Sequence, residues 1–100
     1  MDNGIYIGTE LKFAVNITST GFNMLTDDWK VEIVRGPHKA TFTKEDAIFS
    51  EGQYYICFDT AEFGSGTYYA IITAYIPDTD FPDGLRTEVT KITLCKVEMV

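Results

Sequence analysis

The chain has 100 residues, of which 45% are hydrophobic and 23% are charged, and its formal net charge is −7. These values predict a single globular domain over residues 1–100 with a core of its own. Nucleic acids and anionic membranes attract basic surfaces, so the acidic balance and the scattered Lys and Arg residues argue against both as partners.

No segment has the composition of a signal peptide or the length of a membrane-spanning helix. We therefore expect a protein that is cytoplasmic as synthesised. The spacing of Cys57 and Cys95 matches no zinc site. For a chain without an export signal, two free and buried thiols are favoured over the alternative, a disulfide between them.

Alternation of apolar and polar residues dominates the chain, as is typical of half-buried strands. Residues 5–7 predict a short edge strand, and residues 11–17 predict a second strand with its odd-numbered side chains facing inward. The loop at residues 18–28 contains three large apolar residues: Phe22, Met24 and Leu25. We expect this loop to fold over the end of a sandwich as a lid; a hydrophobic contact surface is the alternative.

The middle of the chain predicts three further strands. Residues 29–33 repeat the alternation with Trp29 inward, a turn at residues 36–38 precedes a short strand at residues 40–43, and residues 53–59 form the next one.

One helical turn is predicted after these strands, capped by Asp59 or Thr60 and ended by Gly64. A long strand over residues 66–76 and a polar loop over residues 77–84 follow.

Residues 85–99 are predicted as one long final strand, but their apolar side chains change parity twice. Each change needs one extra residue, so we expect β-bulges near Thr90-Lys91 and near Leu94-Cys95. About seven short strands without an amphipathic helix predict an all-β fold, an antiparallel β-sandwich of immunoglobulin-like type.

The sequence offers little for catalysis. His38 is the one histidine and lies in a Gly-Pro turn, with no Ser or Cys placed as a strained nucleophile. The Gly64-Ser65-Gly66 segment precedes a strand rather than a helix, so it lacks the helix N-terminus that would bind phosphate. We therefore predict a protein that is not an enzyme and needs no cofactor.

The loop at residues 77–84 is the candidate for a ligand. Its carboxylates could supply oxygens to Ca²⁺ or to a carbohydrate; they belong to Asp78, Asp80 and Asp83. Asp-rich turns of this kind are more often plain solvated hairpin loops. The same loop carries Phe81, which is either folded back on the core or exposed as an anchor for a partner.

A second interaction candidate is the outward face of the strand at residues 66–76, where Tyr69, Ile71 and Tyr75 alternate. This face is apolar for a surface in water, which suggests that another copy or another protein covers it. The alternative is a central strand whose tyrosines lie flat with their hydroxyls in water.

Several segments resemble a known family. The run from Asp59 to Tyr68 resembles the helical turn and tyrosine corner of immunoglobulin-like domains, and Trp29 resembles the buried tryptophan of their third strand. The short first strand ending in Gly8, Glu-Leu-Lys-Phe-Ala-Val, Trp-Lys-Val-Glu-Ile and Gly-Thr-Tyr are similar to the layout of small immunoglobulin-like modules in bacteriophage tail and baseplate proteins, of the upper baseplate protein amino-terminal type.

This resemblance implies a structural component of a phage or prophage virion that assembles with copies of itself or with other tail proteins. It carries over no catalytic residues. Unlike antibody domains, the chain does not have its two cysteines on the two disulfide strands. We accordingly expect a non-catalytic protein-interaction module; a module that holds calcium or a carbohydrate at residues 78–83 is the alternative.

Overall fold

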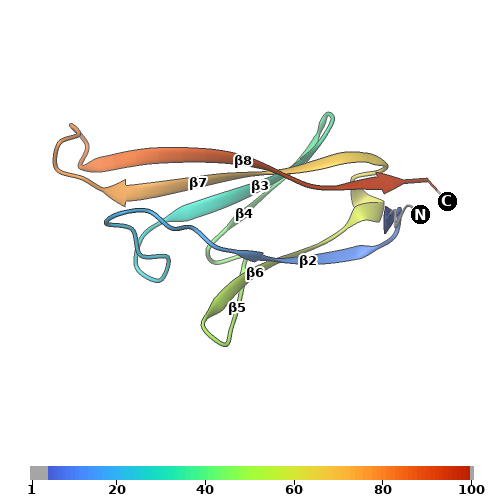
Figure 1. The fold of residues 1–100 in the computed structure, drawn as a ribbon, viewed down its shortest axis with the longest axis horizontal. Helices are drawn as coiled ribbons and strands as arrows, with labels where there is room; N and C mark the ends of the chain where they lie inside the picture. Colours follow the sequence, from blue (N-terminus) through green and yellow to red (C-terminus); the bar gives the residue numbers. More distant parts are fainter. Residues whose placement is uncertain (1–4, 100) are drawn as a thin grey trace.

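The computed structural model describes residues 5–99 and shows eight strands and one short 3-10 helix (Figure 1). They are β1 (Ile5–Tyr6), β2 (Glu10–Val15), β3 (Trp29–Arg35), β4 (His38–Thr43), β5 (Ile48–Ser50), β6 (Gln53–Asp59), η1 (Thr60–Glu62), β7 (Gly66–Pro77) and β8 (Leu85–Glu98). Among the described residues, β5 is the strand that the sequence pattern did not predict; all three of its residues are exposed, so no apolar alternation marks it.

The strands form two sheets, in the orders β1-β8-β7-β3-β4 and β2-β6-β5. This confirms the predicted all-β sandwich. One feature differs from the prediction of an antiparallel fold: β1 pairs with β8 in parallel, so the five-stranded sheet is mixed.

The core lies between the two sheets and follows the predicted alternation. Trp29 is 2% exposed and belongs to one cluster with inward residues of β2, β3, β6, β7 and β8. The fully or nearly buried hydrophobic side chains of this cluster are Val15, Trp29, Val31, Ile33, Ile56, Phe58, Phe63, Tyr68, Ala70 and Val97.

A tyrosine corner closes one end of the core, as predicted. The Asp59 side chain caps η1 by accepting a hydrogen bond from the Ala61 amide. The buried Tyr68 hydroxyl lies 3.1 Å from the Thr60 carbonyl oxygen and 2.5 Å from that of Gly64. The hydroxyl has a single proton, so it donates to these two oxygens in a shared arrangement that ties β7 to the helical turn.

Arg35 supports the same corner from β3. Its guanidinium donates from Nε and Nη2 to the Phe63 carbonyl oxygen, with Nε at 2.7 Å. The arginine side chain lies so close to Gly66 that a Cβ there would be 2.8 Å from Arg35 Cδ, and the φ of Gly66 is +132°. Glycine at this position is therefore required by both backbone conformation and space.

The loop at residues 18–28 covers the end of the sandwich, as predicted for Phe22 and Met24, which pack against the core. The Trp29 indole donates to the Met24 carbonyl oxygen at 3.1 Å. The prediction was wrong for Leu25, whose side chain is 59% exposed. It was also wrong for Cys57: both cysteines are free, but Cys57 is exposed because its parity places it on the outer face of the three-stranded sheet.

The long strand β8 contains one register shift, opposite Tyr68 and Tyr69, where Leu94 is the extra residue. This confirms the predicted bulge at Leu94-Cys95. The predicted bulge at Thr90-Lys91 was wrong, because pairing with β7 is continuous from Leu85 to Thr93. Val89 simply faces outward and is 63% exposed.

The molecule is elongated, with extents of 50 × 30 × 25 Å. Figure 1 shows why: the β7–β8 hairpin extends past the end of β2. The inner face of this extension is covered by the loop at residues 18–28, to which Arg86 donates a hydrogen bond at the Thr20 carbonyl oxygen. We call the extending part of the hairpin, residues 75–90, the overhang.

Candidate protein-binding site

The outward residues of β7 lie on the open face of the five-stranded sheet. Tyr69, Ile71 and Tyr75 are each half-buried, and they alternate along one side of the strand as expected. The Lys91 ammonium of β8 lies 4.2 Å from the centre of the Tyr69 ring, within range of a cation–π interaction. The structure thus places the three residues together on one face.

Charged side chains flank these residues on the neighbouring strands. Glu32 of β3 lies opposite Ile71 and forms an ion pair of 3.1 Å with Lys39. Long charged side chains can cover apolar surface with their aliphatic portions. The outer face is therefore a mixed surface rather than a continuous apolar patch.

Phe81 lies in the loop between β7 and β8 and is 42% exposed. Two hydrogen bonds of 2.9 Å close this loop, from the Asp78 amide to the Gly84 carbonyl and from the Gly84 amide to the Phe81 carbonyl. The loop holds the ring at the far end of the overhang, away from Tyr69 and Ile71.

Two of the three candidate carboxylates of the same loop, those of Asp78 and Asp83, accept local hydrogen bonds. Asp78 accepts from the Asp80 amide at 3.0 Å and from Arg86 at 2.5 Å, and Asp83 accepts from the Leu85 amide at 3.1 Å. The Asp80 amide, followed by Arg86, holds the pKa of the Asp78 carboxyl below its ordinary value. Within residues 5–99 no group of three or more His, Cys, Asp or Glu side chains is arranged to hold a metal ion.

A different site emerges where two strand edges are open on the same side of the sandwich. β2 ends the three-stranded sheet, and among the described residues β8 has an outer neighbour only at Val97 and Glu98, which pair with β1. On the opposite side, residues 44–47 run from β4 to β5 and cross between the sheets. We call the side between β2 and β8 the open side.

The open side contains a groove that reaches the core. One hollow of about 130 Å³ is lined by Ile5, Leu11, Lys12, Phe13, Phe58, Leu94 and Cys95. A second hollow of about 340 Å³ continues along β8 and is lined by Asn16, Ile17, Thr18, Ile72, Ala74, Glu88, Thr90 and Ile92. Partial burial raises the pKa of the Cys95 thiol.

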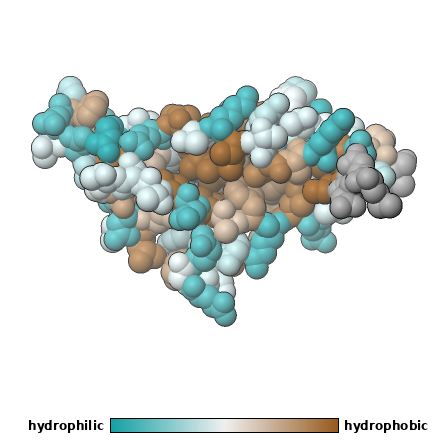
Figure 2. All heavy atoms as spheres, viewed as in Figure 1, coloured by the Kyte–Doolittle hydropathy of each residue, from teal (hydrophilic) through white to brown (hydrophobic). Residues whose placement is uncertain are grey.

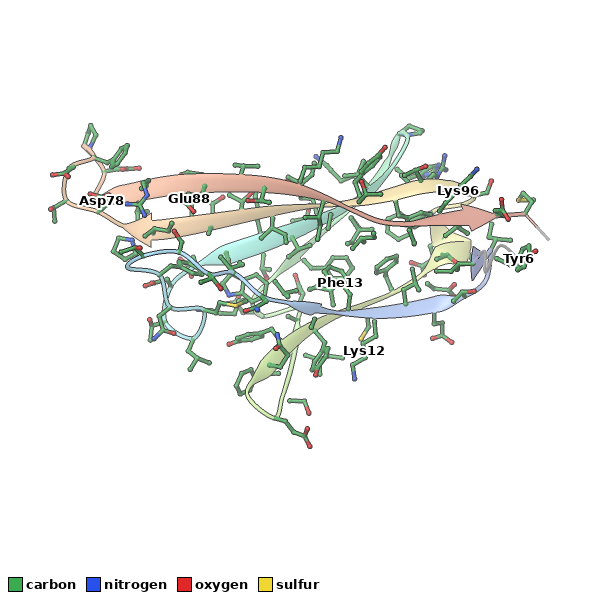
Figure 3. The ribbon with its side chains drawn as sticks, in the orientation of Figure 1. Tyr6, Lys12, Phe13, Asp78, Glu88 and Lys96 are labelled. Carbon is green, nitrogen blue, oxygen red and sulfur yellow. The ribbon has the colours of Figure 1, made fainter. Side chains whose placement is uncertain are left out.

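The figures show how the groove is built. In Figure 2 an apolar band runs across the middle of the molecule, in the region where Figure 1 places the space between β8 and β2. In Figure 3 Phe13 points from β2 into this space, whereas Lys12 points away from it. Ile92, on the β8 side, is 39% exposed.

Alternation in the sequence predicted that Leu11 and Phe13 face inward, but it could not show that this side lacks a covering strand. The short apolar run at residues 5–7 is the sequence signal that could have indicated the missing covering strand. In seven-stranded immunoglobulin-like sandwiches the first strand pairs beside the second. Here β1 has two residues and pairs with β8 instead.

No family model, curated protein or solved structure matches the chain. In the described part of the chain no helix is long and apolar enough to cross a membrane.

Proposed function

We propose that the chain is a non-catalytic protein-interaction module that binds a protein partner along its open side. The single observation that carries this proposal is that, within residues 5–99, the edges of β2 and of β8 before Val97 have no neighbouring strand and flank an apolar groove. An unpaired edge presents backbone N–H and C=O groups to an incoming strand. A groove beside it accepts alternate side chains of that strand.

Apolar side chains on the open side support the same conclusion. Burial of apolar surface is the dominant favourable contribution in most protein–protein association. The groups available for this are the partly buried Leu11, Phe13 and Leu94 and the exposed Ile92. An extended segment with apolar residues at every second position fits this pattern, because its side chains alternate as those of β2 and β8 do.

The resemblance to phage tail and baseplate modules implies a role in assembly. In a virion component of that kind, the open side would join neighbouring copies or neighbouring tail proteins. The exposed ring of Phe81 and the outward residues of β7 would provide secondary contacts at the rim.

Site-specific photocross-linking tests this proposal. With benzoylphenylalanine at position 92, the chain should cross-link to a protein in extracts of the cells or particles that produce it. An excess of unlabelled chain should compete for this adduct, whereas an excess of the Ile92→Lys variant should not. Leu25 is the matched control, because it is apolar and 59% exposed but lies outside the groove. Equal cross-linking at positions 25 and 92 would contradict the proposal.

A further inference from the structure

The free edge of β8 carries a charge pattern that is complementary to itself. Before the bulge, its side chains alternate: Arg86 and Glu88 lie opposite Ile76 and Ala74 of β7, on the inner face. Leu85, Thr87 and Val89 lie on the outer face. Leu85 is 39% exposed and Val89 is 63% exposed, so two apolar residues flank Thr87 at an open edge.

Geometry restricts how a second copy of β8 can pair with this edge. In an antiparallel pair around a two-fold axis, residues directly opposite each other share a face of the sheet. A one-residue slip would place inner side chains opposite outer ones. Each allowed register is therefore defined by the one residue that lies opposite its own copy.

Charge selects one of these registers. If Arg86, Glu88 or Lys91 lies on the axis, that residue faces its own like charge. If Val89 or Thr90 lies on the axis, no charged residue of the strand faces an opposite charge. With Ile92 or Thr93 on the axis, the other copy would meet β1, which occupies the edge at Val97 and Glu98. If Thr87 lies on the axis, Arg86 of each copy faces Glu88 of the other, which forms two opposite-charge pairs.

We propose that two copies of this chain associate through antiparallel pairing of their β8 edges, with Thr87 on the two-fold axis. This inference rests on the proposed function and names the partner as a second copy. The same register places Leu85 opposite Val89 of the other copy and covers both exposed apolar side chains. It joins the two five-stranded sheets into one continuous sheet.

The two charged residues have capacity for these contacts. Arg86 contacts Asp78 at 2.5 Å and Glu88 of its own chain at 3.4 Å, and a guanidinium has five N–H donors. The Glu88 side chain is 46% exposed. The charged pairs set the register, while backbone hydrogen bonds between the strands hold the dimer. Gly84 of one copy lies opposite Thr90 of the other, so the hollow beside Leu94 stays open to a further partner.

Sedimentation of charge-reversed variants tests the register. We expect the wild-type chain to dimerise reversibly, and either Glu88→Lys or Arg86→Glu to weaken the dimer about tenfold or more, because each creates two like-charge pairs. An equimolar mixture of the two variants should regain dimers, since each introduced charge then faces an opposite one. A monomeric wild-type chain, or variants that dimerise as well as wild type, would overturn the proposal.

Disulfide trapping provides a second measurement that does not alter the charges. In a Cys57→Ser, Cys95→Ser background, Thr87→Cys should form an intermolecular disulfide under mild oxidation. Thr90→Cys is the matched control: its two copies would be six positions apart, about 20 Å, which is too far for a disulfide. Preferential trapping at position 90 would overturn the register, and equal or absent trapping at both positions would overturn the dimer.

The outcome for the dimer can be separated from that for the proposed function. If the purified chain is monomeric and untrapped at position 87, while position 92 still cross-links competitively to another protein in extracts, the dimer proposal fails and the interaction module stands. If position 92 cross-links to nothing in extracts but purified copies still form the disulfide at position 87, the dimer stands and the proposed binding of a partner in the groove fails.

Discussion

Tyr68 shows how one side chain can fix the path of the backbone at the end of a sandwich. Its ring is fully buried next to Phe58 and Phe63, and its hydroxyl lies within hydrogen-bonding distance of the carbonyl oxygens of Thr60 and Gly64. The sequence was sufficient to predict this corner, because the Gly-Thr-Tyr segment follows a capped turn. It was not sufficient to predict the contribution of Arg35, which comes from a distant strand and donates to a backbone oxygen.

We expect Tyr68→Phe to lower the free energy of unfolding at neutral pH by about 1–3 kcal/mol, because the carbonyl oxygens of Thr60 and Gly64 lose the hydroxyl that donates to them. Burial raises the pKa of the Tyr68 phenol above its ordinary value near 10. The stability that the neutral phenol contributes is therefore constant below pH 10 and is lost as the pH rises through the higher pKa of the folded state.

Urea unfolding of both proteins at pH 7 and above pH 10 measures this prediction. The difference between wild type and Tyr68→Phe should shrink at the higher pH. Tyr69→Phe, on the outer face of the same strand, serves as the control and should change stability little. Equal stability of wild type and Tyr68→Phe at pH 7 would contradict the role assigned to the corner.

At the scale of the element, β8 combines two environments in one strand. From Leu94 onward it packs on the core, and Val97 is 1% exposed. Before Leu94 it borders the groove and forms one strand of the overhang. Apolar parity is a dependable guide only where a second layer covers the strand. This explains why the bulge at Leu94-Cys95 could be predicted and why the apparent parity change at Thr90-Lys91 does not correspond to a bulge.

Deletion of Leu94 should cost little beyond its own side chain, because it turns the bulge into a regular ladder. Without the extra residue, Cys95 still pairs with Tyr68 and Val97 with Gly66, so Val97 keeps its place in the core. One alanine inserted between Cys95 and Lys96 should instead shift the remainder of β8 by one position and move Val97 to the outer face. We expect the insertion to lower the free energy of unfolding by at least about 2 kcal/mol, from the exposure of Val97 and its neighbours, and the Leu94 deletion to lower it by less. Urea unfolding measures both variants, and a Leu94 deletion as costly as the insertion would show that Leu94 is not the residue left out of the ladder.

At the scale of the whole molecule, the radius of gyration of 15.2 Å exceeds the roughly 13 Å expected for a compact 100-residue domain. The overhang accounts for the difference. Sequence patterns predicted the layers but not this shape, because local alternation carries no information on how far one sheet extends beyond the other. For the same reason the open side, which depends on the absence of a neighbouring strand in the described chain, was not predicted.

The overhang should be the least protected part of the five-stranded sheet. In dilute solution, we expect amides of residues 85–90 to exchange with deuterium at least about tenfold faster than those of residues 70–74 of β7, which has a partner on both sides. Hydrogen exchange with mass spectrometry measures this directly. The Glu88→Lys variant provides the control for association, since its edge should remain free at high concentration. Uniform protection along β7 and β8 in dilute solution would contradict the expectation.

The parallel pairing of β1 with β8 also has a mechanical consequence. Ile5 lies beside Val97, and the Ile7 amide donates to the Glu98 carbonyl oxygen at 2.8 Å. When tension pulls on Ile5 and Glu98 in opposite directions, two parallel strands are drawn past each other lengthwise. Their hydrogen bonds are then loaded together in shear rather than opened one by one. Under such a load, this small contact would bear the force first, before the sandwich behind it.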